Sequence, residues 1–289
     1  MELLFLGPML RVSAVCIVLW LAGCNSAFYQ PNSRVYVEPE RLKIRYTDHT
    51  LITESGTKLH GRVFHRGGEG PSRGLFVLFH GNAQNLTAHF LQFAWVLSRG
   101  YDLFVFDYPG YGSSEGAATR GSTLEAGAAA LDFVSTRLLP AETGRLILVG
   151  ESLGGALLLR AFPDWKDRRR ATLVVAECTF LSYRSEARWV LSRHWLTWAF
   201  QPLVPLLVTE EGSPRGHVAR ISPTPLLVAA CQEDRVMNPA FARDIFERAG
   251  RPKRLWELPG CGHIQAFQTR ENRERLMGLI DSLGIPSGA

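Results

Sequence analysis

Residues 146 to 162 read LILVGESLGGALLLRAF and join two patterns of secondary structure. The first five residues form a short, continuous apolar run, which is typical of a strand covered on both faces. From Leu153 onward the apolar residues recur at helical spacing. Ser152 therefore lies where a strand turns sharply into a helix, between Gly150 and Gly154 in the pattern G-x-S-x-G.

A serine at such a turn has a strained backbone, at a cost of about 1–3 kcal/mol that packing must offset. Gly150 and Gly154 lack the Cβ atoms that would collide where strand and helix cross, and Gly155 lets the helix lie closer still. The hydroxyl then projects beyond the sheet edge, where helix amides point at it. The pattern therefore predicts that Ser152 is a nucleophile.

The same pattern occurs a second time, as GSSEG at residues 112–116. Here Ser114 lies in the Pro/Gly-rich run DYPGYGSSEG, several residues before the next helix, whose start is indicated by Ser122 and Glu125 as a capping box. A loop cannot hold a serine as a strand–helix corner does. We therefore expect Ser114 to be a loop residue.

The rest of the chain repeats the alternation of apolar strand and amphipathic helix. Asn238 with Pro239, and Thr269, are predicted helix starts. Three β-rich stretches come first, LKIRY, TLITE and KLHGRVFH, with a turn at Ser55 and Gly56 between the last two. The strands predicted after them are LFVLFH (75–80), DLFVFD (102–107), LILVG (146–150), TLVVAE (172–177), PLLVAAC (225–231) and RLWELP (254–259).

Strands alternating with helices predict an α/β fold with a doubly wound, mostly parallel sheet. One connection, after the sixth strand, is far longer than an ordinary crossover. We interpret residues 179–221 approximately as a small helical cap, broken by Pro202 and Pro205. Two hypotheses stay open for its tryptophans: they roof an acyl-binding cavity, or they form the cap's own core. These are Trp189, Trp195 and Trp198.

The N-terminus carries Arg11 and an apolar run that ends at Leu21-Ala22-Gly23-Cys24, too short to span a bilayer. This end resembles a bacterial lipobox, which implies a lipoprotein signal over residues 1–23 and a lipid anchor on Cys24. A plain cleaved signal or an anchor helix is the alternative. We expect a tether over residues 24–40, a domain over 41–289, and a place in the bacterial cell envelope, facing the periplasm or the outside.

Composition excludes several classes of function. The 289 residues are 46% hydrophobic with a net charge of +5 spread along the chain, and no nucleic-acid-binding pattern is present. No group of residues has metal-ligand spacing, and no nucleotide-binding loop occurs, so no metal and no cofactor are expected.

The chain has five cysteines, and Cys178, Cys231 and Cys261 fall within the expected domain. Export would allow a disulfide without requiring one. A bond between Cys231 and Cys261 would tie two neighbouring loops together. The sequence favours the simpler reading, in which all three are unpaired thiols that behave as small apolar residues.

Together these features resemble the α/β-hydrolase superfamily. Its landmarks appear as HGN (80–82), DYPGYGSSEG (107–116), GESLGG (150–155), EDRV (233–236) and PGCGH (259–263), which cover most of the chain after residue 60. The superfamily's order of catalytic residues is serine, acid, histidine. Within it, the chain is similar to small-cap serine hydrolases, which include esterases, acyl-protein thioesterases and some peptidases.

A serine nucleophile needs a base, and the base needs an orienting carboxylate. The resemblance implies His263 as the base, in the loop after the last strand, and Asp234 as the acid. Glu233 and, less strongly, Glu177 are competing acids. His80 is interpreted as a structural hydrogen-bonding residue.

The oxyanion of the intermediate needs two backbone donors, which we expect from the N–H groups of Leu153 and Asn82. The resemblance implies a serine hydrolase that cleaves carboxylic esters or thioesters through an acyl-enzyme, on a small-molecule or acyl-bearing substrate, with membrane attachment through its N-terminal lipid. A peptidase or amidase with the same triad is one alternative. A non-catalytic lipoprotein scaffold is the other, although a scaffold has no need of all three triad residues.

Overall fold

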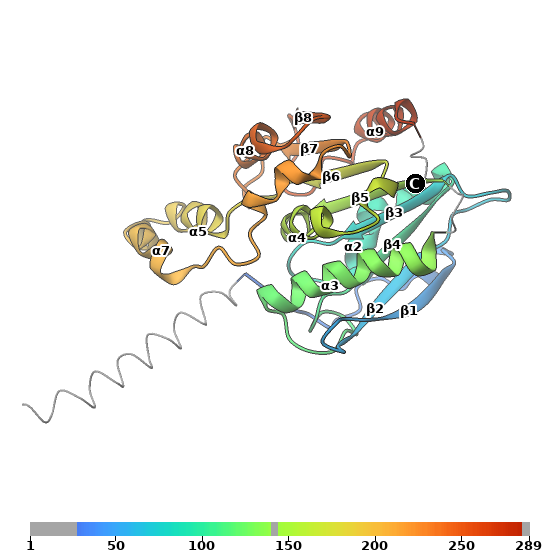
Figure 1. Cartoon of the computed structure of the whole chain (residues 1–289), viewed down its shortest axis with the longest axis horizontal. Helices are drawn as coiled ribbons and strands as arrows, with labels where there is room; N and C mark the ends of the chain where they lie inside the picture. The colour runs from blue at the N-terminus through green and yellow to red at the C-terminus, as the bar shows by residue number, and fades with distance from the viewer. Residues whose placement is uncertain (1–27, 140–143, 285–289) are drawn as a thin grey trace, which may run out of the picture.

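The computed structural model describes residues 28–139 and 144–284 (Figure 1). The expected signal segment at residues 1–23 and the proposed anchor Cys24 lie outside the described residues. No helix in these two ranges has both the length and the apolar composition needed to cross a bilayer.

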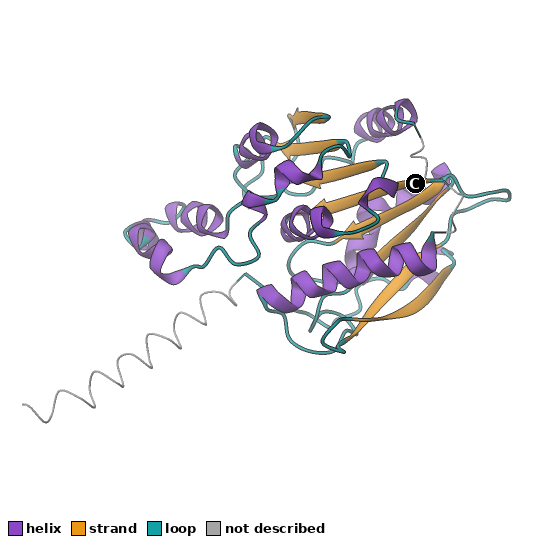
Figure 2. Ribbon diagram, viewed as in Figure 1, coloured by secondary structure: helices purple, strands orange, loops and turns teal. Residues whose placement is uncertain are grey.

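The described residues form one eight-stranded sheet with helices on both faces (Figure 2). The strand order is β1-β2-β4-β3-β5-β6-β7-β8, in which β2 pairs antiparallel with both β1 and β4 and every other pair is parallel. This confirms the expected mostly parallel, doubly wound sheet. The strands are β1 (Tyr46–Ile52), β2 (Lys58–Phe64), β3 (Gly74–Phe79), β4 (Tyr101–Phe106), β5 (Arg145–Glu151), β6 (Leu173–Glu177), β7 (Leu226–Cys231) and β8 (Lys253–Leu258).

Alternate residues of the central strands belong to two separate cores. In β3, Val77 and Phe79 belong to the core that also contains residues of α3, α4 and α8, whereas Phe76 and Leu78 belong to the core that contains residues of α2 and α9. Because both faces are covered, the strand reads as a continuous apolar run. The α-helices are α2 (Leu86–Phe93), α3 (Arg120–Phe133), α4 (Leu153–Ala161), α5 (Tyr183–Ser192), α6 (Trp195–Trp198), α7 (Val204–Leu207), α8 (Phe241–Arg248) and α9 (Arg270–Ser282).

Short helical turns complete the fold. One π-helical turn, η3 (Val134–Leu138), extends α3. The 3-10 turns are η1 (Pro39–Leu42), η2 (Ala94–Arg99), η4 (Phe162–Asp164), η5 (Arg168–Arg170), η6 (Gln201–Leu203), η7 (Pro214–Gly216) and η8 (Val218–Ile221).

The six predicted strands of the α/β region are confirmed to within one or two residues. The prediction of separate strands in LKIRY and TLITE is wrong, because β1 is a single strand from Tyr46 to Ile52. Neither glycine nor proline interrupts that stretch, and β1 lies at an edge of the sheet, where polar residues can face solvent. The turn at Ser55 and Gly56 is confirmed, with Gly56 at φ 86°.

Two predicted helix starts are displaced. Helix α3 begins three residues earlier than expected, with Thr119 as its N-cap and Ser122 as its capping-box partner. Glu125 instead accepts a hydrogen bond from the backbone N–H of Ser55. Ser122 therefore takes the N3 position of the capping box and not the N-cap position.

The second displaced start is that of α8, which begins at Phe241 and not directly after Asn238. Asn238 Oδ1 accepts from the backbone N–H of Ala240 at 3.0 Å, so the side chain stabilises a turn before the helix. Thr269 is confirmed as a cap, because its Oγ1 accepts from the N–H of Asn272 at the start of α9.

The long connection after β6 contains α5, α6, η6 and α7, which stand apart from the sheet (Figure 1). The two hypotheses for its tryptophans are both wrong for Trp195 and Trp198, which are exposed to solvent. The short helices are too small to enclose such large rings. Trp189 is half-buried, with the guanidinium of Arg193 5.1 Å from its ring centre.

Residues 28–37, within the expected tether, pack on the domain. Tyr29 is buried and accepts a hydrogen bond from Thr123 Oγ1 at 3.2 Å. Farther along, the N–H of Tyr36 donates to Thr87 Oγ1 at 3.0 Å. These contacts place the start of the described chain against α3 and α2 and not in a free linker.

Candidate active site

Ser152 occupies the corner between β5 and α4. Its backbone angles are φ 52° and ψ −119°, a region that residues with a Cβ rarely adopt. The N–H of Ser152 donates to the carbonyl of Glu177 at 2.9 Å, and its carbonyl accepts from Thr179 Oγ1 at 2.6 Å. Two hydrogen bonds, one with the end of β6 and one with the loop just beyond it, thus hold the strained corner in place.

The glycines around Ser152 allow close packing, as the sequence predicts. A Cβ at Gly150 would lie 2.5 Å from the Cα of Gly155, and a Cβ at Gly154 would lie 2.1 Å from the carbonyl oxygen of Phe79. The first contact is strand β5 against helix α4, and the second is α4 against β3. Backbone atoms cannot move aside as a side chain can, so both positions require glycine.

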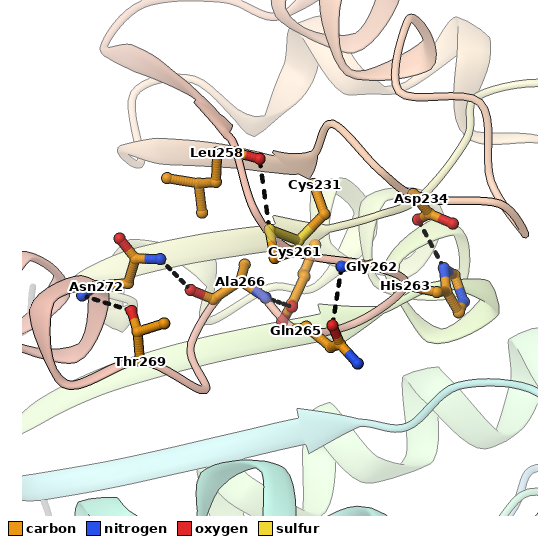
Figure 3. The surroundings of a disulfide bond; sticks show 11 residues. Cys231, Asp234, Leu258, Cys261, Gly262, His263, Gln265, Ala266, Thr269 and Asn272 are labelled. Atoms are coloured by element: carbon orange, nitrogen blue, oxygen red, sulfur yellow. Dashed lines mark hydrogen bonds and ion pairs between the residues drawn. A yellow bond between two sulfur atoms is a disulfide. The ribbon is translucent and has the colours of Figure 1, made fainter.

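Asp234 and His263 form a hydrogen-bonded pair (Figure 3). His263 Nδ1 donates to Asp234 Oδ2 at 2.8 Å, while Asp234 Oδ1 accepts from the N–H groups of Val236 and Met237 at 2.8 and 2.9 Å. The competing acid Glu233 is exposed to solvent. The structure therefore brings Asp234, and not Glu233, to the imidazole.

The carboxyl of Asp234 is held in its ionised form. Burial raises its pKa, but the hydrogen bond and charge of His263 and the two backbone amides lower it by more, so the net pKa lies below the ordinary value. An ionised acid on Nδ1 fixes the tautomer of His263 and leaves Nε2 as a proton acceptor.

The pair lies at the same sheet edge as Ser152. Cys178 follows β6, the strand that pairs with β5, and Ser152 binds the preceding residue, Glu177. The ligand atoms of Cys178, Asp234 and His263 lie within 4.8 Å of one another. Among the described residues this is the one cluster able to hold a metal ion, and doing so would compete with the Asp234–His263 hydrogen bond.

A disulfide joins Cys231 and Cys261, with their Cα atoms 5.0 Å apart (Figure 3). The favoured reading of three unpaired thiols is therefore wrong, and only Cys178 is free among the described cysteines. Cys231 ends β7 before the Asp234 loop, and Cys261 lies two residues before His263. Parallel pairing of β7 with β8 brings the two cysteines together, which spacing along the chain does not reveal.

Glu177 supports the loop of His263 by a hydrogen bond to its backbone. Its Oε1 accepts from the N–H of Ala266 at 2.8 Å. Burial, and then the charge of neighbouring Glu151, raise the pKa of Glu177 well above its ordinary value, which favours its neutral form. A neutral carboxyl bonded to the backbone is not the acid that orients His263. This supporting role was not foreseen from the sequence.

The loop after β3 lies beside Ser152, as expected for an oxyanion loop. A Cβ built on Gly81 would lie 3.6 Å from the Cβ of Ser152. The side chain of the next residue, Asn82, is fixed by two donors, the N–H of Gln30 at 2.9 Å and Tyr111 Oη at 2.7 Å. Leu153, the other expected donor, is the first residue of α4.

Asp107, in the motif DYPGYG, organises the surrounding loops and has a role that the sequence did not reveal. Its Oδ1 accepts from the N–H of Leu86 at 2.7 Å and lies 3.5 Å from His80 Nε2. Ser114 Oγ donates to the carbonyl of Asp107 at 2.8 Å and accepts from the N–H of His60 at 2.9 Å. Ser114 and His80 are thus structural residues.

Glu186 is a second buried acid that sequence reasoning missed. It lies in the first turn of α5 in the cap, and its Oε2 has no hydrogen-bond partner. Burial, followed by the charge of Asp234, raises its pKa to about 8.

A known family model matches most of this chain. The model described as "Alpha/beta hydrolase family" matches residues 76–276. The chain belongs to the alpha/beta hydrolase family. Family and fold together support hydrolase activity.

Relatives extend over almost the whole chain. The protein YfhR of Escherichia coli O157:H7, described as uncharacterized, is 30% identical over 277 residues, which are 94% of this chain and 92% of that protein. The protein bem46 of Schizosaccharomyces pombe is 23% identical over 241 residues, 82% of this chain and 77% of that protein.

Two solved esterases share the fold. The esterase Pf2001 of Pyrococcus furiosus superposes with a TM-score of 0.68 at 19% identity, covering 89% of this chain and 97% of the other. The acetyl xylan esterase of Paenibacillus sp. R4 gives a TM-score of 0.65 at 20% identity, covering 93% and 94%.

Proposed function

We propose that this protein is a serine hydrolase that cleaves carboxylic esters or thioesters with Ser152, His263 and Asp234 as its triad. The observation that carries the proposal is the hydrogen bond from His263 Nδ1 to the ionised Asp234, at the sheet edge that also holds the strained corner of Ser152. That bond leaves Nε2 of the imidazole as the proton acceptor that a serine nucleophile needs.

In the proposed reaction, Ser152 Oγ attacks the acyl carbon while its proton passes to His263 Nε2. The tetrahedral intermediate collapses as the imidazolium returns that proton to the leaving alcohol or thiol, which gives an acyl-enzyme on Ser152. A water molecule then attacks the acyl group, again with proton transfer to His263. The second collapse releases the acid and restores the serine.

The developing oxyanion is stabilised by backbone donors in this proposal. Leu153 begins α4, so its N–H is among those that a helix leaves without an internal partner. Asn82 follows Gly81, which is adjacent to Ser152. Each such donor typically contributes about 2.7–4 kcal/mol to transition-state stabilisation.

Ester chemistry is preferred because the Pyrococcus and Paenibacillus proteins that share the fold are esterases. Thioesters undergo the same acyl transfer, and they stay within the proposal. A panel of ester, thioester and aminoacyl substrates tests the class. Turnover of aminoacyl amides alone would favour the peptidase alternative.

A fluorophosphonate probe tests the mechanism, since it labels only an activated serine. We expect labelling of the wild type and of Ser114→Ala, and none of Ser152→Ala. Ser114 is the matched control, because it lies in the second G-x-S-x-G pattern and bonds to the backbone. Labelling that persists in Ser152→Ala would contradict the assignment, and no labelling of any form would favour a scaffold.

We also propose that Cys24 carries a lipid that anchors the enzyme in the bacterial cell envelope, on the periplasmic or outer side. The support is the lipobox-like run Leu21-Ala22-Gly23-Cys24. Metabolic labelling with radioactive palmitate is expected in the wild type and absent in Cys24→Ala. Equal labelling of both forms would contradict the anchor.

A further inference from the structure

The cap exposes a group of large apolar side chains, here called the cap patch. Trp195 is 79% exposed, Leu206 74% and Trp198 63%. These are high values for residues that ordinarily avoid water. The cap patch consists of Val190, Trp195, Leu196, Trp198, Phe200, Leu203 and Leu206.

The residues of the cap patch come from elements that pack on one another. Helix α5 contacts α6, η6 and α7, and α7 contacts η6. Figure 1 shows α5 and α7 projecting together from the body of the molecule, away from the sheet. Exposed apolar groups that gather on one projecting unit mark an interaction surface, whereas single exposed residues do not.

The charge of the cap indicates the partner. Residues 179–221 contain five arginines, Arg184, Arg188, Arg193, Arg215 and Arg220, and three acids, which are Glu210, Glu211 and, in α5, Glu186. Glu186 is buried, and its pKa of about 8 keeps it mostly uncharged at neutral pH. The cap therefore presents tryptophan and leucine beside positive charge, the combination that suits the headgroup region of an anionic bilayer.

The start of the described chain lies at the same cap. The ring of Phe28 packs edge-on against Tyr183, the first residue of α5, with ring centres 5.1 Å apart. Cys24 precedes Phe28 by four residues, which span at most about 14 Å. A lipid on Cys24 would thus hold the bilayer close to the base of the cap.

We propose that the cap patch is a membrane-docking surface that inserts Trp195 and Trp198 into the interface of an anionic bilayer. The orientation rests on the proposed lipid anchor at Cys24, and the surface is independent of the catalytic assignment. A second copy of this chain is the competing occupant, and the test separates the two.

Tryptophan quenching measures the contact directly. The full chain is purified in detergent and reconstituted into vesicles of phosphatidylcholine and phosphatidylglycerol, with or without bromine on the acyl chains. Brominated chains are expected to quench the wild type, and most of the quenched emission is expected to disappear in Trp195→Phe/Trp198→Phe. Equal quenching of wild type and variant would overturn the proposal.

A second variant weakens docking and keeps both reporters. Leu196→Ser/Leu206→Ser is expected to lose the quenching of Trp195 and Trp198. Ile52→Ser/Leu91→Ser is the matched control, because these apolar residues, 65% and 42% exposed, lie on β1 and α2 far along the chain from the cap. The control is expected to be quenched like the wild type.

Two further readouts complete the test. Hydrolysis of a water-soluble short-chain ester is expected to be equal in wild type and Leu196→Ser/Leu206→Ser. Membrane docking would be overturned in favour of a second copy by two results together. The wild type would sediment as a dimer that Leu196→Ser/Leu206→Ser no longer forms, and the brominated vesicles would not quench the wild type. Quenching in a protein that no fluorophosphonate labels would refute the hydrolase function and still support the cap patch.

Discussion

At the scale of single residues, the corner at Ser152 shows how far a local pattern reaches. Gly150 and Gly154 predicted a tight turn, and the structure shows that a Cβ at either position would collide with backbone atoms. The groups that hold the corner, Thr179 Oγ1 and the carbonyl of Glu177, lie more than twenty residues away. A local motif therefore predicts the strain but not what sustains it.

Asp234→Asn is expected to reduce kcat for ester hydrolysis by about 10⁴-fold. The N–H groups of Val236 and Met237 both donate to Oδ1, so an asparagine there keeps its oxygen on them and turns its NH₂ toward His263. The imidazole would then accept at Nδ1 and carry its proton on Nε2, where it cannot take the proton of Ser152. Steady-state kinetics measure the loss.

Glu233→Gln provides the control for that change. It neutralises the adjacent acid, which is exposed and was a competing candidate in the sequence. We expect its kcat to match that of the wild type. The assignment of the acid would be contradicted if kcat fell less than tenfold in Asp234→Asn. It would also be contradicted if kcat fell more than tenfold in Glu233→Gln.

At the scale of elements, the buried strands were predictable and the cap was not. Strands such as β3 and β7 are covered on both faces, so an apolar run alone identifies them. In the cap, α6 and α7 are four residues each, too short for a period to show which side faces solvent. The sequence therefore predicted wrong positions for Trp195 and Trp198, and only the packing of the cap shows that they are exposed.

The disulfide between Cys231 and Cys261 joins two elements of the candidate site. Its loop closes 30 residues, for which the chain-entropy relation gives about 3–4 kcal/mol of stabilisation. Cys231→Ala/Cys261→Ala is expected to lower the free energy of unfolding in urea by about that amount. It is also expected to lower kcat/KM, because the loops of Asp234 and His263 lose their covalent link.

A thiol count checks the pairing independently of stability. The oxidised, denatured domain is expected to show one reactive thiol from its three cysteines, that of Cys178. Three thiols would contradict the bond. Unchanged kcat/KM in Cys231→Ala/Cys261→Ala, with the expected loss of stability, would limit the disulfide to a structural role.

At the scale of the whole molecule, the candidate site is assembled from segments spread over the chain. Ser152, Asp234 and His263 follow three different strands. The order serine, acid, histidine, with the resemblance and the placement in loops, led to their selection, and Glu233 and Glu177 stayed open as competing acids. The supporting contacts join segments that no pattern relates. Glu177 reaches the loop of Ala266, and Gln30 reaches Asn82, only because the sheet brings them together.

The raised pKa of Glu177 predicts that this residue makes the stability of the whole fold depend on pH. Below its ordinary pKa of 4.5 the carboxyl is protonated in both the folded and the unfolded chain. As pH rises, the unfolded chain releases the proton, while the folded chain keeps it because burial and Glu151 raise the pKa. The folded state then binds more protons than the unfolded state, so stability falls with rising pH.

Glu177→Gln removes this titration and keeps an oxygen for the N–H of Ala266. Its free energy of unfolding is expected to equal that of the wild type near pH 4 and to exceed it by an increasing margin toward pH 8, as urea titrations at several pH values would measure. Glu233→Gln, at an exposed acid, is expected to show no such trend. A margin that is constant or shrinks with pH would mean that Glu177 is ionised in the folded protein, and the support of the His263 loop would then rest on a charge and not on a neutral acid.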